Sequence, residues 1–197
     1  MSLNTRLFLD VNRFARHTPW LHGVAVAYVN LAVAGLAVLV LIGVLVARHR
    51  PSGVLAAAVW SGLAGPVAVG LNQPLIHALD EKRPFVTLPH VLVLVHRSAD
   101  AGLPSDHATL AGAVLAAMYL VDRRLGVVAT VVGVLLAADR VYVGVHYPGD
   151  VLAGLAVGAA VALLGWLLTR VLLTALVRRL RAGSLRRLLT ADRVRTA

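Results

Sequence analysis

The sequence predicts an all-α integral membrane protein: a helical bundle with about five transmembrane helices and an interfacial amphipathic helix at its amino terminus. Hydrophobic residues make up 59% of the 197 residues and charged residues only 14%, and the mean hydropathy is +0.81. Soluble domains have roughly half apolar and about a quarter charged residues. The apolar residues form long runs of Ala, Val, Leu and Gly, and such small side chains let helices pack closely in lipid. The length fits a single membrane-embedded domain, 1–197, with a core at 20–178 and a basic cytoplasmic tail at 178–197.

Each transmembrane element is predicted from the length of an apolar stretch, because roughly 20 residues are needed to cross about 30 Å of hydrocarbon. The five stretches run from about Leu21 to Ala47, Val54 to Leu79, His107 to Val121, Leu125 to Val143 and Pro148 to Val177. The third is short, so we expect its outer end to lie slightly below the membrane surface. Residues 4–17 place Leu7, Phe8, Val11 and Phe14 near one face and arginines largely elsewhere, which is typical of an interfacial helix.

The basic residues predict the orientation in the membrane. The formal net charge is +10, and the last apolar stretch is followed by Arg178, Arg179, Arg181, Arg186, Arg187, Arg193 and Arg195. By connectivity, Arg48, Arg50, Arg123 and Arg124 share the side of this tail, and an excess of arginine marks the cytoplasmic side, where anionic lipid lies. The arginines of the amino-terminal helix fall on the other side and oppose this assignment in part. No aromatic-interleaved basic patch accompanies the charge, so we expect the bilayer and not nucleic acid as a partner.

Three short polar segments interrupt the apolar sequence. They are Arg83-Pro84, then Pro104-Ser105-Asp106-His107, then Arg140 followed by His146 and Asp150. One excursion across the membrane and back separates His107 from Arg140, so all three segments can meet at one face of a bilayer. Their side chains can hold a phosphoryl group, attack it and release an alcohol without a metal. The chain has no cysteine, which excludes disulfides, thiolate chemistry and Cys-ligated metal.

The third segment has the spacing of an oriented histidine. His146 and Asp150 lie four residues apart with Pro148 between them, and proline suits the first turn of a helix, so the last span is expected to begin there. A carboxylate that binds one imidazole nitrogen fixes the tautomer and leaves the other nitrogen as a nucleophile or base. Arg140 can hold phosphoryl oxygens in a fork. The structural alternative is a helix-capping aspartate beside an interfacial histidine.

The second segment lies where a loop enters the third span. Backbone N–H groups at a helix start form a seat for an anion, and the Ser105 hydroxyl adds a donor. His107 then stands beside the seat as a general acid for a leaving oxygen. Ordinary helix capping explains Ser105 and Asp106 well, but it leaves His107 unexplained. Arg83, with Lys82 beside it, is by itself better explained as an interfacial arginine at the end of the second span.

The connection at 84–103 is the only sizeable loop that we expect. Its apolar run, 91–95, is interpreted either as a short helix on the membrane or as a lip that guides a lipid tail into the site. Asn72, Gln73 and His77 lie inside or near the second span, and polar groups at that depth usually face a bundle interior. We expect them to pack the helix under the site.

The polar segments resemble the motifs of the type 2 phosphatidic acid phosphatase superfamily of membrane lipid phosphatases. That family has a Lys and Arg-Pro element, a Pro-Ser-x-His element, and an Arg with His six and Asp ten residues later; the match covers about residues 72–155. The Pro-Ser-Asp-His form and the run Val-Gly-Val-His-Tyr-Pro are similar to the bacterial undecaprenyl pyrophosphate phosphatase branch. The chain departs from the pattern at Ile76, where lysine is usual, at Asp106, where glycine is frequent, and at Asp139, where serine is frequent. Whether Lys82 takes the lysine's role is open.

The resemblance and the residue chemistry imply hydrolysis of a phosphate from a membrane lipid at the outer face. His146 is expected to form a phosphohistidine, Asp150 to orient it, and His107 to protonate the leaving oxygen and then activate water. The expected ligands of the phosphoryl oxygens are Lys82, Arg83, Ser105, Asp106 and Arg140. No metal or other cofactor is expected, because arginines supply the positive charge.

Other functions remain open at this point. The resemblance favours a polyprenyl pyrophosphate as substrate, with phosphatidic acid and phosphatidylglycerophosphate as alternatives. A non-catalytic phospholipid transporter or binding protein could use the same basic residues without turnover, but it leaves the pairing of His146 with Asp150 unexplained. A vanadium haloperoxidase shares the superfamily's site residues, although five spans argue against that soluble enzyme. A purely structural membrane protein is the least favoured.

Overall fold

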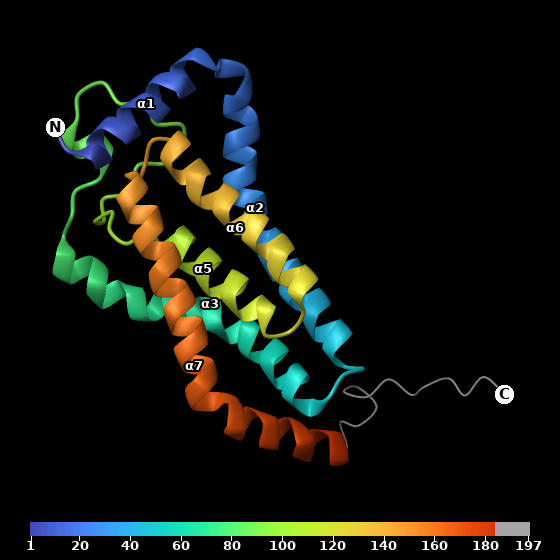
Figure 1. Cartoon of the computed structure of the whole chain (residues 1–197). Helices are drawn as coiled ribbons and strands as arrows, with labels where there is room; N and C mark the ends of the chain where they lie inside the picture. Colours follow the sequence, from blue (N-terminus) through green and yellow to red (C-terminus); the bar gives the residue numbers. More distant parts are fainter. Residues whose placement is uncertain (184–197) are drawn as a thin grey trace.

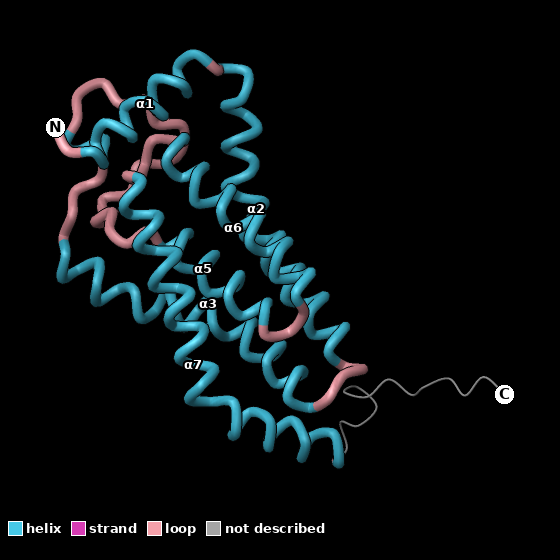
Figure 2. The backbone as a smooth tube through the Cα atoms, viewed as in Figure 1, coloured by secondary structure: helices cyan, strands magenta, loops and turns pink. Residues whose placement is uncertain are grey.

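The protein is an elongated bundle of helices in a computed structural model that describes residues 1–183 (Figures 1 and 2). The helices are α1 (Leu3–His17), α2 (Pro19–Ala47), α3 (Ser52–Leu79), α4 (Pro84–Thr87), α5 (Asp106–Tyr119), α6 (Arg123–Tyr142) and α7 (Pro148–Ala182). No strand occurs among the described residues, which confirms the all-α class. Residues 178–182 of the predicted basic tail belong to α7, and residues 184–197 lie outside the described part.

Four helical segments are long and apolar enough to cross a membrane. They are Pro19–Ala47, Ser52–Thr87, which includes α3, Arg123–Tyr142 and Pro148–Ala182. The expected number of about five is therefore corrected to four by length and composition. The missing member is α5, whose 14 residues rise only about 21 Å, less than the roughly 30 Å of hydrocarbon.

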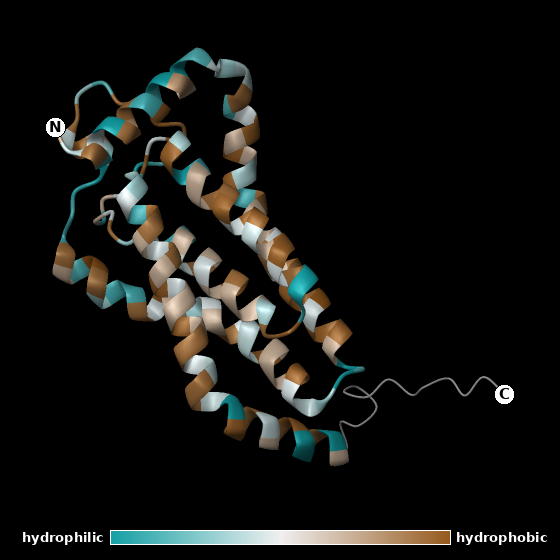
Figure 3. Ribbon diagram, in the orientation of Figure 1, coloured by the Kyte–Doolittle hydropathy of each residue, from teal (hydrophilic) through white to brown (hydrophobic). Residues whose placement is uncertain are grey.

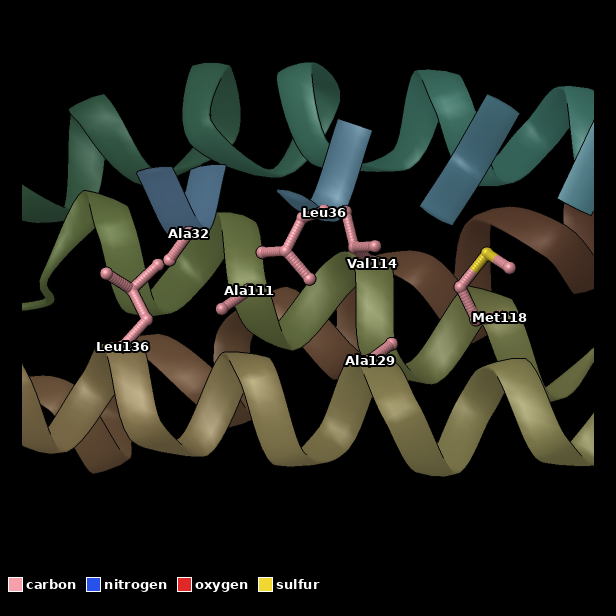
Figure 4. Packing of buried hydrophobic residues seen from close by; sticks show 7 residues of the cluster. All are labelled: Ala32, Leu36, Ala111, Val114, Met118, Ala129 and Leu136. Carbon is pink, nitrogen blue, oxygen red and sulfur yellow. The ribbon is translucent and has the colours of Figure 1, made fainter. Parts of the chain in front are cut away.

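The short helix α5 lies inside the bundle. It packs against α2, α3, α6 and α7, and most of its residues are buried. Surrounding helices shield it from lipid, and it leads from Ser105 at the site to Asp122, which pairs with Arg50 at the opposite end of the bundle. One of the apolar clusters that hold it joins Ala32 and Leu36 of α2, Ala111, Val114 and Met118 of α5, and Ala129 and Leu136 of α6 (Figure 4).

Glycines bring α5 and α7 into close contact. A Cβ on Gly158 would meet the backbone oxygen of Thr109, and one on Gly154 would lie 2.6 Å from the backbone oxygen of Ser105. Small residues let helix backbones approach closely in a membrane bundle, where van der Waals packing is a main source of stability. The contact places the start of α5 against the first turns of α7, and these two places carry two of the polar segments.

Large apolar residues are exposed on the outside of the bundle, and hydrophobic residues are frequent along its helices (Figure 3). Leu168, Val171 and Leu172 of α7 are 84%, 77% and 72% exposed. Soluble monomers rarely leave such extended apolar surface in water. Lipid chains are the natural neighbours of this surface, in agreement with an integral membrane protein.

The amphipathic helix α1 covers the end of the bundle at which α6 finishes (Figure 1). Phe8 is fully buried, and the side chain of Asn12 both donates to the carbonyl oxygen of Leu92 (2.8 Å) and accepts from its N–H (3.1 Å). Leu7 and Phe14 remain 46% and 56% exposed. One edge of the helix therefore packs on the protein while the other keeps apolar side chains outside. Its position in a membrane interface stays a prediction.

The apolar run at 91–95 does not form the short helix that was one expectation. Tertiary contacts hold its backbone instead: the Leu94 N–H donates to the carbonyl oxygen of Val143 at 3.0 Å. Gly144, with a φ of +85°, allows this approach, since a Cβ there would collide with the carbonyl oxygen of Leu92. The run thus supports the loop that leads into α7, and its role as a lip for lipid stays a prediction.

Candidate active site

All three polar segments meet at one end of the bundle, where α5 and α7 begin and α6 ends (Figure 1). The N–H of Ser105 donates to the carbonyl oxygen of Asp150 at 3.1 Å, which joins the starts of α5 and α7. Nη1 of Arg83, from the segment after α3, lies 3.1 Å from Nε2 of His146. Side chains that are far apart in the sequence therefore form one polar cluster.

His146 and Asp150 form a buried pair at the start of α7, and their side chains are 3% and 2% exposed. Nδ1 of His146 lies 3.4 Å from Oδ2 of Asp150, and the same oxygen accepts the Tyr147 N–H at 2.9 Å. The carboxylate therefore caps α7 and faces the imidazole at once. Tyr147 is fixed in turn, because its ring packs edge-on against Phe8 and its hydroxyl lies 2.7 Å from that of Thr87.

The neighbours of the His146 ring define its tautomer. A guanidinium can only donate, so Nε2 accepts from Nη1 of Arg83 and the ring proton lies on Nδ1, facing Asp150. Burial and the nearby charges of Arg83 and Arg140 lower the pKa of His146 well below its usual value. At neutral pH the imidazole is therefore neutral, with its lone pair on Nε2, which is the nucleophilic form.

The two buried arginines differ in how their donors are used. Arg83 donates from Nε to the carbonyl oxygen of Asp100 (3.0 Å), from Nη2 to Oδ2 of Asp100 (3.1 Å), and from Nη1 to Val145 O (3.3 Å). Arg140, near the end of α6, is 8% exposed, and its Nε has no hydrogen-bond partner among the described residues. A buried charged donor without a partner is unfavourable. Of the two buried arginines, Arg140 is thus the one whose Nε is left without an acceptor in the described part of the chain.

The start of α5 adds further donors to the site. Ser105 is the N-cap of α5 and completely buried, and its Oγ has no hydrogen-bond partner within residues 1–183. His107 follows in the first turn, partly buried, where the charges of Arg140, Arg83 and His146 act on it. A buried hydroxyl, a helix start and a second imidazole thus lie in the same polar cluster as the arginines, a combination suited to binding a phosphate.

Asp106 and Lys82 have other partners in the structure. Asp106 accepts from Asn72 at 2.8 Å and from Gln73 at 3.1 and 3.2 Å, which attaches the start of α5 to α3. Nζ of Lys82 lies 3.1 and 3.2 Å from the carboxylate oxygens of exposed Asp80. Contacts of Asp106 and Lys82 with a substrate stay predictions.

The sequence did not point to Asp100 and Gly102, which we call the clasp on Arg83. The Gly102 N–H donates to the carbonyl oxygen of Glu81 at 2.8 Å and closes the loop. A Cβ on Gly102 would lie 3.2 Å from Cγ of Arg83 and 3.2 Å from Oδ2 of Asp150. The one available signal was an aspartate and a glycine in the loop directly ahead of the second polar segment.

Fold and site together define a helical membrane protein with two buried arginines and two histidines gathered at one end of the bundle. The family model described as the PAP2 superfamily matches residues 64–173. The chain is 31% identical over 162 residues to undecaprenyl-diphosphatase BcrC of Bacillus subtilis, covering 82% of each chain. It is also 31% identical over 162 residues to the putative undecaprenyl-diphosphatase YbjG of Escherichia coli, covering 80% of this chain and 78% of that one.

A solved structure agrees with this assignment. The fold matches the crystal structure of a transmembrane PAP2 type phosphatidylglycerolphosphate phosphatase from Bacillus subtilis with a TM-score of 0.57 and 26% identity, over 81% of this chain and 82% of that chain. The chain belongs to the PAP2 superfamily, as its motifs predict, and it is a lipid phosphatase of this superfamily.

Gly102→Ala is expected to lower kcat about tenfold. The added methyl group must displace Arg83 or Asp150 by a few tenths of an ångström, and hydrogen bonds hold both. Misplacing reacting groups by about 1 Å costs roughly 10²-fold. Phosphate release in detergent measures the change. Gly23→Ala, where a Cβ meets nothing within 4 Å, is the matched control. Equal kcat values for the two variants would show that Arg83 and Asp150 can move away from the added methyl group without loss of activity.

Proposed function

We propose that the protein hydrolyses a polyprenyl diphosphate, with undecaprenyl diphosphate favoured, at the outer face of the cell membrane through a phosphohistidine at His146. The observation that carries this proposal is the buried imidazole whose Nδ1 faces Asp150 and whose Nε2 keeps its lone pair. The substrate is supported by two relatives that align with most of the chain and are named undecaprenyl-diphosphatases.

The proposed reaction has two displacements at the terminal phosphorus. Nε2 of His146 attacks, the bond to the lipid phosphate breaks, and His107 donates a proton to the leaving oxygen. His107 then takes a proton from water as the water oxygen attacks the phosphohistidine and the N–P bond breaks. The products are a lipid monophosphate and inorganic phosphate. The carboxylate of Asp150 stabilises the positive charge that the phosphorylated ring carries.

Arg140, Arg83, the Ser105 hydroxyl and the N–H groups at the start of α5 are proposed to neutralise the phosphoryl oxygens. Preorganised donors of this kind supply most of the catalysis of phosphoryl transfer. Nη1 of Arg83 occupies the lone pair of His146 at 3.1 Å in the free protein. It has to exchange that acceptor for a phosphoryl oxygen before His146 can attack.

The proposed orientation places the site outside and the opposite end of the bundle in the cytoplasm. Arginines gather at that opposite end. Arg50 pairs with Asp122 at 2.9 Å, and Arg181 donates to the carbonyl oxygens of Arg48 and Arg50 at 3.1 and 2.9 Å. An excess of arginine is typical of the cytoplasmic side, which supports this orientation.

Phosphate release from a panel of lipids tests the proposed function. Detergent-purified protein is expected to hydrolyse undecaprenyl diphosphate faster than phosphatidic acid or phosphatidylglycerophosphate, and to do so in EDTA because arginines supply the charge. Within residues 1–183 no three His, Asp or Glu side chains converge to hold a metal ion, and independence from metal stays a prediction. Faster release from another lipid would reassign the substrate, and EDTA inhibition reversed by a divalent cation would contradict the metal-free reaction.

His146→Ala is the control for this panel. An enzyme loses phosphate release while keeping affinity for the lipid, because Arg140 and Ser105 remain. A lipid-binding or transport protein without turnover would show no phosphate release in the unmodified chain either. That result would reject the proposed enzyme outright.

A further inference from the structure

Asp100, in the loop between α4 and α5, holds Arg83 through two atoms. Its carbonyl oxygen accepts from Nε at 3.0 Å and its Oδ2 accepts from Nη2 at 3.1 Å. One residue thus binds a whole edge of the planar guanidinium, and this fixes the plane of the group as well as its position. The Arg83 side chain is 8% exposed and that of Asp100 is 52% exposed, so Asp100 is the partner on the solvent side.

The opposite corner of the same guanidinium faces the nucleophile. Nη1 donates to the carbonyl oxygen of Val145 at 3.3 Å and to Nε2 of His146 at 3.1 Å. The four contacts occupy four of the five N–H groups of an arginine. With the other edge held by Asp100, Nη1 stays directed at the space in front of Nε2 of His146, and only its acceptor there can change.

We infer that Asp100 is a positioning residue of the phosphatase: by holding one edge of Arg83, it directs Nη1 at Nε2 of His146 in the free protein and at the attacked phosphoryl group in the complex. The inference rests on the proposed function. A charged phosphoryl oxygen is a stronger acceptor than a neutral imidazole. It therefore takes the hydrogen bond over, and the lone pair of His146 is released only when substrate is in place.

The position of Asp100 explains why the clasp needs a carboxylate. The Arg83 guanidinium is buried and positively charged, and it lies beside the His146 ring, which also becomes positive when it is phosphorylated. The negative charge of Asp100 balances the charge of Arg83. Asparagine at position 100 keeps the size of the side chain and one oxygen that can accept from Nη2 of Arg83. Alanine keeps only the backbone carbonyl oxygen that accepts from Nε of Arg83. Glutamate keeps the charge, and the half-exposed side chain has room to adjust.

Asp100→Ala is expected to lower kcat/KM for undecaprenyl diphosphate about 10–50-fold, the size of a lost hydrogen bond between charged groups. Asp100→Asn is expected to fall between Asp100→Ala and the unmodified protein, and Asp100→Glu to recover most of the activity. Asp10→Ala is the matched control. Asp10 also pairs with an arginine, Arg13 at 3.4 Å, but its side chain is exposed on α1, and its loss is expected to leave kcat/KM unchanged.

A double-mutant cycle with Arg83→Lys shows whether Asp100 acts through Arg83. Lysine cannot make the two-atom contact, so adding Asp100→Ala to Arg83→Lys is expected to cause less than a twofold further loss. Equal losses in both backgrounds, or no loss from Asp100→Ala alone, would overturn the positioning role. Unmodified protein that hydrolyses none of the panel lipids would instead reject the proposed function, and the two failures are thereby distinguished.

Discussion

Asp150→Asn is expected to lower kcat by about 10²–10⁴-fold, the range of acid–base partners in catalysis. The asparagine oxygen can replace Oδ2 and keep the contacts with Tyr147 N–H and Nδ1 of His146. The negative charge is lost, however, in a place that is 1% exposed, where it stabilises the positively charged phosphorylated ring. The NH₂ group of the asparagine would also take the position of Oδ1, which has no hydrogen-bond partner within the described residues, so its two N–H groups would be buried without an acceptor.

Rapid-quench measurement of phosphate release and of protein-bound phosphate checks this prediction. Asp150→Asn is expected to slow the formation and the breakdown of the phosphoenzyme alike, and therefore not to accumulate it. Asp122→Asn is the matched control, because Asp122 caps α6 through the N–H groups of Arg124 and Leu125, at 2.9 and 3.4 Å, without touching a histidine. Asparagine caps helices as well as aspartate does. If both variants reduced kcat equally, helix capping alone would explain Asp150.

His107→Ala is expected to reduce turnover of the lipid by about 10²–10⁴-fold and to trap a phosphohistidine at His146 when the substrate has a good leaving group. Release of p-nitrophenol needs little proton donation, so the first step continues without His107. The second step still needs a base for water, so the phosphoenzyme accumulates. His107 is partly buried in the first turn of α5 and feels the charges of Arg140 and Arg83, as a group beside the proposed phosphoryl site would.

Alkaline quenching preserves phosphohistidine, and mapping of the acid-labile label identifies its position. Label on any residue other than His146 would contradict the nucleophile. The lack of label in His107→Ala, with equal losses for the lipid and for p-nitrophenyl phosphate, would contradict a role for His107 in the leaving group. His77→Ala, which removes an exposed histidine from α3, is the control and is expected to behave as the unmodified protein.

The part of the site that lies within one turn of a helix could be predicted from the sequence. Pro148 predicts the start of α7, and the structure confirms it. Because that start is set locally, a spacing of four residues is enough to bring His146 and Asp150 together. Ser105 likewise occupies the N-cap position of α5, at the entry of a loop into a helix that the sequence predicts, but its hydroxyl makes no capping hydrogen bond within residues 1–183.

The partners of the charged side chains could not be predicted in this way. Lys82 and Asp106 were both expected at the phosphoryl oxygens, yet Lys82 binds Asp80 and the Asp106 carboxylate accepts from two side-chain amides of α3. Asp100 stands in an irregular loop with no periodic pattern around it. Which of several charges meets which depends on contacts between distant residues, and no local spacing encodes these.

By itself, the sequence determined the membrane class, the all-α fold and the positions of the long helices and α5, whose starts agree with the apolar stretches to within two residues; the four-residue helix α4 was expected as loop. Run length, proline and caps are local properties, and they decide where a helix begins and ends. Only the tertiary structure decided that α5 is a short buried helix, which Gly154 and Gly158 allow to pack closely on α7. It also decided that Arg83 is shared between Asp100 and His146, which lie 17 and 63 residues away in the chain. Such contacts form only when the complete bundle brings these segments together.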